Sequence, residues 1–120
     1  MRDAKQTTWE TYTNAWREAS ADAKAAALAQ SVAASCVYQD PLMTAKGHGE
    51  LINYMLDFHK QIPGGHFVTT SFLAHHDASV AKWNMVDAAG KVLGDGVSFG
   101  QYDGEGALVA MTGFFEVPAQ

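Results

Sequence analysis

The residue best suited to chemistry in this sequence is Asp40, which stands in the stretch VYQDPLMTAKGHGEL between an apolar run and Pro41. The residue before a proline is disfavoured in a helix, so Asp40 is expected to end a strand. A carboxylate at the mouth of an apolar pocket suits removal of a proton from a carbon next to a carbonyl group. Aspartate is equally common in turns, where it accepts backbone hydrogen bonds. Both interpretations of Asp40 stay open.

Proton abstraction of this kind also needs a donor for the developing enolate oxygen, because electrostatic stabilisation is usually the largest catalytic contribution. The candidate donors carry a hydroxyl or an indole N–H: Tyr12, Trp16, Tyr54 and Ser98. A pocket for a small ligand would be lined by aromatic and thioether side chains, and the candidates are Tyr12, Met43, Tyr54, Met55, Phe58, Trp83, Met85, Met111 and Phe115. Methionines suit an adaptable cavity, and they suit a filled core equally well.

Histidines supply the remaining candidates. His48 stands between two glycines, where a flexible backbone could bring the imidazole over the pocket as a general acid or ligand contact, or where it could simply begin a helix in water. His75 and His76 precede Asp77 and suggest a metal site. Adjacent strand residues point to opposite faces, however, so the pair is expected at the surface without a metal. We predict no metal and no cofactor.

Helices are expected in the first half of the chain. The stretch 7–20 has Thr7 and Glu10 at capping-box spacing and an aromatic stripe along one face. A second helix is expected from Ser20, as its N-cap, through the alanine-rich stretch to about residue 35. A short strand, CVYQDP, precedes a third helix over 48–63, which the sequence PGG ends.

The hydrophobic period then changes to that of strands. Four strand-like segments, at 66–77, 79–87, 91–103 and 107–117, are separated by turn sequences rich in aspartate and glycine. Helices followed by a meander of antiparallel strands predict an α+β domain in which the sheet curls over the helices. The outward faces of the strands would carry Val97, Phe99, Leu108 and Phe114, and this apolar surface favours a homodimer.

Composition narrows the classes of function. With 8 Lys+Arg against 13 Asp+Glu the formal charge is −5, and the basic residues are scattered, so nucleic acid is a poor candidate partner. Cys36 is the only cysteine, which excludes an intrachain disulfide and a thiolate zinc cluster. The N-terminal stretch lacks the apolar core of a signal peptide, and no run is long enough to span a membrane. We therefore expect a cytoplasmic protein without a membrane partner.

The ordered set of YQDP, KGHGELINYM at the start of the third helix, and YDGEGALVAMTGFFEV at the end resembles the nuclear transport factor 2-like superfamily. Within it, the chain is similar to SnoaL-like polyketide cyclases and ketosteroid isomerase-related proteins. The resemblance covers nearly the whole chain and implies one domain over 1–120. It also implies a cone in which a strongly bent, mostly antiparallel sheet wraps three N-terminal helices and leaves an apolar pocket at its open end.

The resemblance also implies roles for particular residues. Asp40 falls where ketosteroid isomerases hold the carboxylate that moves a proton between carbons. Trp16 falls where those enzymes carry a tyrosine that stabilises the enolate, and Ser98 falls near their second oxyanion-hole acid, so both donors are altered. With His48 as a further polar contact, these residues form the candidate catalytic set.

The implied activity is cofactor-independent proton transfer, of isomerase or cyclase type, on a small hydrophobic carbonyl compound in a homodimer. The alternatives are a non-catalytic module that binds a small molecule in the same pocket, and a dimerisation domain whose cone is filled. A carboxylate already saturated by donors would favour binding over catalysis.

Overall fold

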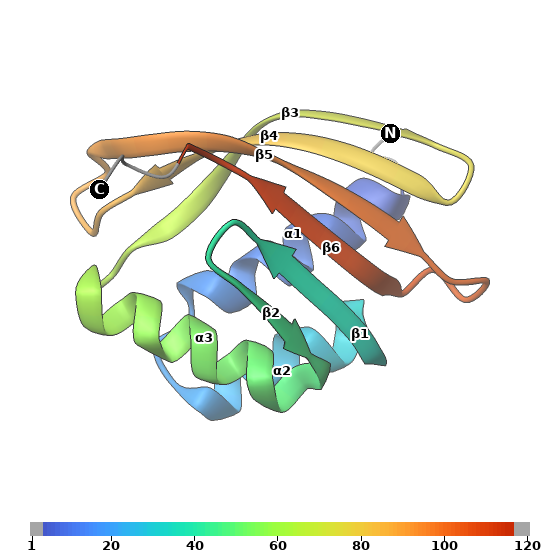
Figure 1. The fold of residues 1–120 in the computed structure, drawn as a ribbon, viewed down its shortest axis with the longest axis horizontal. Helices are drawn as coiled ribbons and strands as arrows, with labels where there is room; N and C mark the ends of the chain where they lie inside the picture. The colour runs from blue at the N-terminus through green and yellow to red at the C-terminus, as the bar shows by residue number, and fades with distance from the viewer. Residues whose placement is uncertain (1–3, 117–120) are drawn as a thin grey trace.

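A computed structural model describes residues 4–116 of the chain. Helices α1 (Ala4–Arg17), α2 (Ala21–Ser31) and α3 (Gly47–Gln61) pack against one face of a curved sheet (Figure 1). The strands are β1 (Val32–Asp40), β2 (Met43–Lys46), β3 (His66–His75), β4 (Ala78–Val86), β5 (Val92–Tyr102) and β6 (Leu108–Phe114). Their order in the sheet is β2-β1-β6-β5-β4-β3. All neighbouring pairs are antiparallel except β1 and β6, which are parallel.

Helix α1 lays its aromatic stripe into the core. Trp9, Tyr12 and Trp16 recur at helical spacing and are 2%, 3% and 5% exposed. The helix begins at Ala4, so the expected cap at Thr7 is wrong: Thr7 lies inside the helix and its carbonyl accepts a hydrogen bond from the Thr11 hydroxyl. Because Trp9, Tyr12 and Trp16 all line one side, α1 forms one wall of the interior.

Helix α2 ends, and strand β1 begins, a few residues earlier in the chain than expected. Ser20 caps α2 as predicted, with its Oγ accepting from the Ala23 N–H at 3.1 Å. The helix ends at Ser31 rather than near residue 35, and Val32 already pairs with Leu108 of β6. Pairing with the sheet overrides the helical preference of the alanines that follow. Strand β1 therefore runs for nine residues and ends at Asp40, which is partly buried.

Strand β2 was not predicted from the sequence. It pairs with β1 in a tight hairpin, with Asp40 opposite Met43. The Asp40 carboxylate accepts from the backbone N–H groups of Leu42 and Met43, which fixes the turn around Pro41. This short edge strand connects β1 directly to α3.

Lys24 joins the three helices from inside the protein. Its side chain is fully buried, and Nζ donates to the carbonyl oxygens of Ala15 at 3.0 Å and Glu18 at 2.6 Å, at the end of α1. It also lies 3.4 Å from Nδ1 of His59 on α3, whose Nε2 lies 3.1 Å from the Gly65 carbonyl oxygen. The ammonium group thus satisfies helix-end carbonyls that would otherwise be unpaired.

No helix in the described part of the chain is long and apolar enough to cross a membrane.

Burial lowers the pKa of Lys24 to about 8, against a smaller opposing effect of Glu18. Between about pH 8 and 10.5 the native lysine has lost its proton while the unfolded one keeps it, so the unfolded state binds more protons. We therefore expect the free energy of unfolding to rise with pH across this window, by up to about 1.4 kcal/mol per pH unit.

The measurement is urea denaturation across this pH window for the wild type, Lys24→Met and the exposed-lysine control Lys60→Met. The rise in the free energy of unfolding that comes from Lys24 should be absent from Lys24→Met and present in the other two proteins. Parallel pH profiles for all three proteins would contradict the assignment.

Candidate functional site

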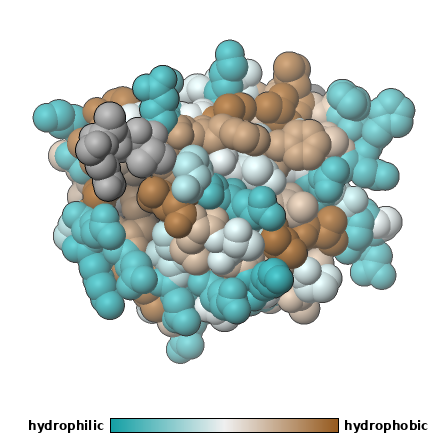
Figure 2. All heavy atoms as spheres, viewed as in Figure 1, coloured by the Kyte–Doolittle hydropathy of each residue, from teal (hydrophilic) through white to brown (hydrophobic). Residues whose placement is uncertain are grey.

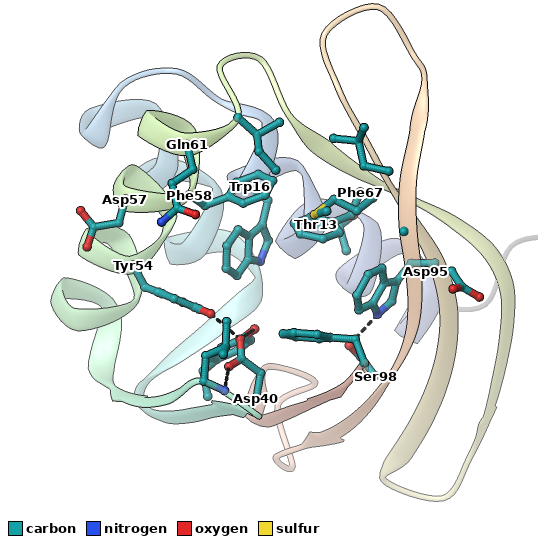
Figure 3. Close-up of a pocket in the computed structure, with 18 of the residues that line it drawn as sticks. Thr13, Trp16, Asp40, Tyr54, Asp57, Phe58, Gln61, Phe67, Asp95 and Ser98 are labelled. Atoms are coloured by element: carbon teal, nitrogen blue, oxygen red, sulfur yellow. Dashed lines mark hydrogen bonds between the residues drawn. The ribbon is translucent and has the colours of Figure 1, made fainter. Parts of the chain in front are cut away.

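A cavity of about 440 Å³ lies between α1, α3 and the concave face of the sheet. This volume is within the usual range for small-molecule sites. Nine of the lining residues are aromatic: Trp9, Tyr12, Trp16, Tyr38, Tyr54, Phe58, Phe67, Trp83 and Phe115. Figure 3 shows side chains from helices and strands turned toward a shared space, with Asp40 at its floor. The filled cone considered above is therefore wrong.

Asp40 ends β1 and accepts four hydrogen bonds. Oδ1 is held by the main chain, at 2.8 Å from the Leu42 nitrogen and 3.1 Å from the Met43 nitrogen. Oδ2 accepts from the hydroxyls of Tyr38 at 2.6 Å and Tyr54 at 2.7 Å. The turn interpretation of Asp40 therefore holds for Oδ1, whereas Oδ2 bonds to two tyrosines that line the cavity.

Tyr38 is a site residue that the sequence interpretation missed. It precedes Asp40 by two positions on a strand, and residues at this spacing share a face of the sheet. That alternation was the available signal. Burial, and then neighbouring acidic groups including Asp40, raise the pKa of Tyr38 far above that of free tyrosine. Burial and the hydrogen bond to Asp40 also raise the pKa of Tyr54.

Trp16 and Ser98, at the positions of the family's oxyanion donors, each have a hydrogen-bond partner within the protein. Trp16 Nε1 donates to the Tyr12 hydroxyl at 3.1 Å, and Trp83 Nε1 donates to Ser98 Oγ at 2.9 Å. Both pairs line the cavity. The indole N–H of Trp16 is therefore already used, whereas the Ser98 hydroxyl accepts this bond and keeps its own hydrogen to donate.

Gly113 on β6 lies beside three residues of the cavity lining, although it is not itself part of that lining. A Cβ atom built there would lie 3.6 Å from Asp40 Cβ, 3.6 Å from Ser98 Oγ and 3.8 Å from the Tyr38 hydroxyl. These are ordinary contact distances, so a small side chain fits without displacing the backbone. It would occupy space between Asp40 and Ser98, which makes Gly113 a second position that sequence reasoning missed.

Several predicted site residues lie elsewhere. The cavity lining includes Asp40, Trp16, Ser98, Tyr12, Tyr54, Phe58, Trp83, Met85 and Phe115, and it does not include His48, Met43, Met55 or Met111. His48 Nε2 lies 2.8 Å from the Val32 carbonyl oxygen, at the opposite end of β1 from Asp40. Met55 and Met111 are 0% and 1% exposed within the hydrophobic core, and Met43 packs against it. The spacing of these methionines predicts that they face inward, but hydrophobic periodicity does not distinguish a core position from a cavity position.

The histidine pair lies at the exposed β3–β4 hairpin end, as expected, but its two rings do not point to opposite faces. His76 has a positive φ of 52°, so the chain turns there instead of continuing as a strand. The two Nδ1 atoms of His75 and His76 consequently lie 3.1 Å apart rather than on opposite faces. Among the described residues, no group of three or more His, Cys, Asp or Glu side chains is arranged to hold a metal ion.

Alkaline titration tests the buried tyrosines. Burial is the main cause that raises the pKa of Tyr12, Tyr38 and Tyr54 above 10, so these phenols stay protonated in the native state after they would ionise in the unfolded chain. The native state then binds more protons, and stability should fall as the pH rises above 10.

Tyrosinate absorbance should accordingly show that three of the four tyrosines ionise only on unfolding. Tyr38→Phe should reduce the pH dependence. Ordinary titration of all four tyrosines in the native protein would contradict this description of the site.

Comparison with known proteins places the chain in a family. Residues 11–119 match the model of the SnoaL-like domain, and no curated protein matches the chain. A SnoaL-like family protein from Agrobacterium tumefaciens is similar in structure, with a TM-score of 0.86 and 23% identity over 95% of this chain and 98% of that one.

Two further structures contain small molecules. A protein with a ketosteroid isomerase-like fold from Catenulispora acidiphila, in complex with trimethylamine, has a TM-score of 0.74 and 13% identity over 92% of this chain and 85% of its own. TerC, co-crystallised with polyporic acid, has a TM-score of 0.76 and 12% identity over 95% of this chain and 92% of its own. The likeness to these structures is one of fold. Since the family model spans most of the chain, the protein belongs to the SnoaL-like family, with the α+β cone of nuclear transport factor 2-like proteins.

Proposed function

We propose that the cavity binds a small, mainly apolar carbonyl compound and that Asp40 moves a proton between its carbon atoms without a cofactor. The observation that carries this proposal is the cluster at Asp40 Oδ2. This carboxylate oxygen accepts hydrogen bonds from the Tyr38 hydroxyl at 2.6 Å and the Tyr54 hydroxyl at 2.7 Å, and all three residues line the cavity. Base and enolate donors are thus supplied by a single group of side chains.

When a carbonyl compound binds, the Tyr54 hydroxyl would move its hydrogen bond from Asp40 Oδ2 to the carbonyl oxygen. That oxygen would accept from Tyr54, which comes from the partly exposed face of α3. That exchange frees an acceptor position on Oδ2 while Oδ1 stays fixed by the main chain. The carbon–hydrogen bond next to the carbonyl then breaks, its proton goes to Oδ2, and the electron pair is delocalised onto the enolate oxygen. Return of the proton to a carbon completes the transfer.

The remaining residues have supporting roles in this proposal. Trp16 provides a wall through its ring contacts with Tyr54 and Phe58, at centroid separations of 5.8 and 5.7 Å. Ser98, held by Trp83, is the second donor that a substrate oxygen could reach. In this proposal the Tyr54 hydroxyl takes the place of the oxyanion donor that the family has at the position of Trp16.

The rival function is binding without chemistry. It is favoured by the number of donors on Asp40, since four hydrogen bonds occupy the acceptor positions of a carboxylate. The two relatives with trimethylamine and polyporic acid are in keeping with a fold whose cavity takes small molecules. A binding module needs the same walls, so only a measurement of proton transfer separates the two functions.

Deuterium exchange at the carbon next to a carbonyl provides that measurement. With small hydrophobic ketones that shift the melting temperature, wild type should catalyse exchange and Asp40→Asn should lose about 10²–10⁴-fold. Tyr54→Phe should lose about 10²–10³-fold in kcat if it donates to the enolate. If Tyr54 only occupied Asp40, its removal would leave exchange unchanged or faster.

Two controls complete this test. Asp77→Asn makes the same change at an exposed turn position outside the cavity and should exchange as wild type does. Gly113→Val fills the floor beside Asp40 and should weaken ketone binding while Asp40 is intact. Binding to both wild type and Asp40→Asn with no exchange in either would refute proton transfer for those ketones and leave the binding module.

We further propose a homodimer through the outer face of the sheet. Leu73, Val80 and Phe99 lie side by side across β3, β4 and β5 and are 69%, 38% and 40% exposed. Phe114 on β6 is 56% exposed, whereas Leu108, expected on this face, is fully buried. Figure 2 shows hydrophobic side chains gathered along the upper part of one face of the molecule. An apolar surface of this kind is typical of a protein interface.

A charge placed in this surface should separate the subunits. Phe99→Lys is expected to give a monomer in sedimentation or light-scattering measurements at concentrations where wild type is a dimer, because an unpaired ammonium would be desolvated in the interface. Ala89→Lys adds the same charge in the exposed β4–β5 turn and should leave the dimer intact. A wild type that stays monomeric at all concentrations would refute the proposal.

A further inference from the structure

Within residues 4–116, the Asp40 carboxylate at the cavity has no cationic side chain among its hydrogen-bond partners. The four donors to Asp40 are two backbone N–H groups and two phenols, all of them neutral. Burial keeps both phenols protonated by raising their pKa. Among the described residues that line the cavity, none is a lysine, arginine or histidine, whereas the acidic residues are Asp40, Asp57, Asp95 and Glu116.

Neutral donors orient the Asp40 carboxylate but do not cancel its charge. A carboxylate beside aromatic walls loses part of its hydration, and a buried charge is stabilised most by an opposite charge with good geometry. An anionic ligand would add a second negative charge to this space. The cavity is therefore better matched to a cation than to an anion of the same shape.

The walls have the composition that suits an organic cation. Trp16 meets Phe58 and Phe67 at interplanar angles of 84° and 80°, with ring centroids 5.7 and 5.3 Å apart. Phe67 in turn meets Trp83 at 84° and 5.0 Å. Phe58 and Phe67 stack at 25° and 5.2 Å, so these four rings (Trp16, Phe58, Phe67 and Trp83) pack directly on one another and form an aromatic wall of the cavity. The faces of such rings attract ammonium groups.

Asp57 and Asp95, at the rim of the cavity, add to the negative electrostatic potential around it. In Figure 3 the carboxylates of Asp57 and Asp95 point away from the cavity, so they are not ligand contacts. Asp57 is also 3.6 Å from Lys60, in an exposed pair. Together with the formal charge of −5 on the chain, they favour approach of cations over anions.

We propose that the ligand is a small organic cation, namely a carbonyl compound that also carries a protonated or quaternary amine. Its ammonium group lies against this aromatic wall, in the same cavity as the Asp40 carboxylate. Its carbonyl oxygen faces Tyr38 and Tyr54, and only this second placement rests on the function proposed above. The charge preference follows from the lining itself.

Three phenyl ketones of nearly equal shape test the charge preference: phenacyltrimethylammonium, neopentyl phenyl ketone and phenacylsulfonate. Calorimetry or tryptophan fluorescence should give the cation about tenfold or more higher affinity than the neutral ketone, as expected for a desolvated cation–aromatic contact beside a carboxylate. The anion should bind most weakly. Asp40→Asn should reduce the preference for the cation over the neutral ketone, and Asp77→Asn should keep it.

Hydrogen exchange of the same compounds, scored against buffer and Asp40→Asn, keeps the two proposals distinguishable. Cation preference without catalysed exchange supports the cation site and refutes proton transfer. Catalysed exchange of a neutral ketone that binds as tightly as the cation supports proton transfer and overturns the cation site. Failure of the cation to bind at millimolar concentration, or an undiminished preference in folded Asp40→Asn, also overturns it.

Discussion

The structure of the site depends on one carboxylate that is shared between a turn and a cavity. Asp40 uses Oδ1 to fix the β1–β2 hairpin and Oδ2 to hold the hydroxyls of Tyr38 and Tyr54. Because Tyr54 comes from α3, the same residue ties the third helix to the end of β1. The orientation of this carboxylate is therefore fixed by the backbone of one short turn, and the two phenols meet at its other oxygen.

Two hydrogen-bonded pairs elsewhere in the cavity lining leave Asp40 and its two tyrosines as the main polar group there. Trp16 is bonded to Tyr12 and Trp83 to Ser98, so both indole N–H groups are engaged before any ligand enters. The remaining wall is mostly apolar. A ligand with one polar group would therefore gain most by turning that group toward Asp40 and its phenols, whereas its apolar part can fill the rest of the cavity.

Much of the fold could be predicted from periodicity. The aromatic stripe of α1, the Ser20 cap and four long strands were all expected within a few residues of their observed bounds. What failed were local signals that tertiary pairing overrides. Val32 leaves the helix because β6 is beside it, and the four residues of β2 form a strand because β1 is available to pair with them.

The site shows the same division between local pattern and tertiary position. Asp40 could be found because a proline follows it, and Tyr38 could have been found because it is two residues away on the same strand face. Met55 and Met111 could not be separated from the cavity lining by sequence, since core and cavity occupy the same inward faces and differ only in depth. Leu108 and His76 depend on where a strand bends or turns. Fold therefore follows largely from residue patterns, whereas the boundary between a filled interior and a binding cavity is a property of the three-dimensional packing.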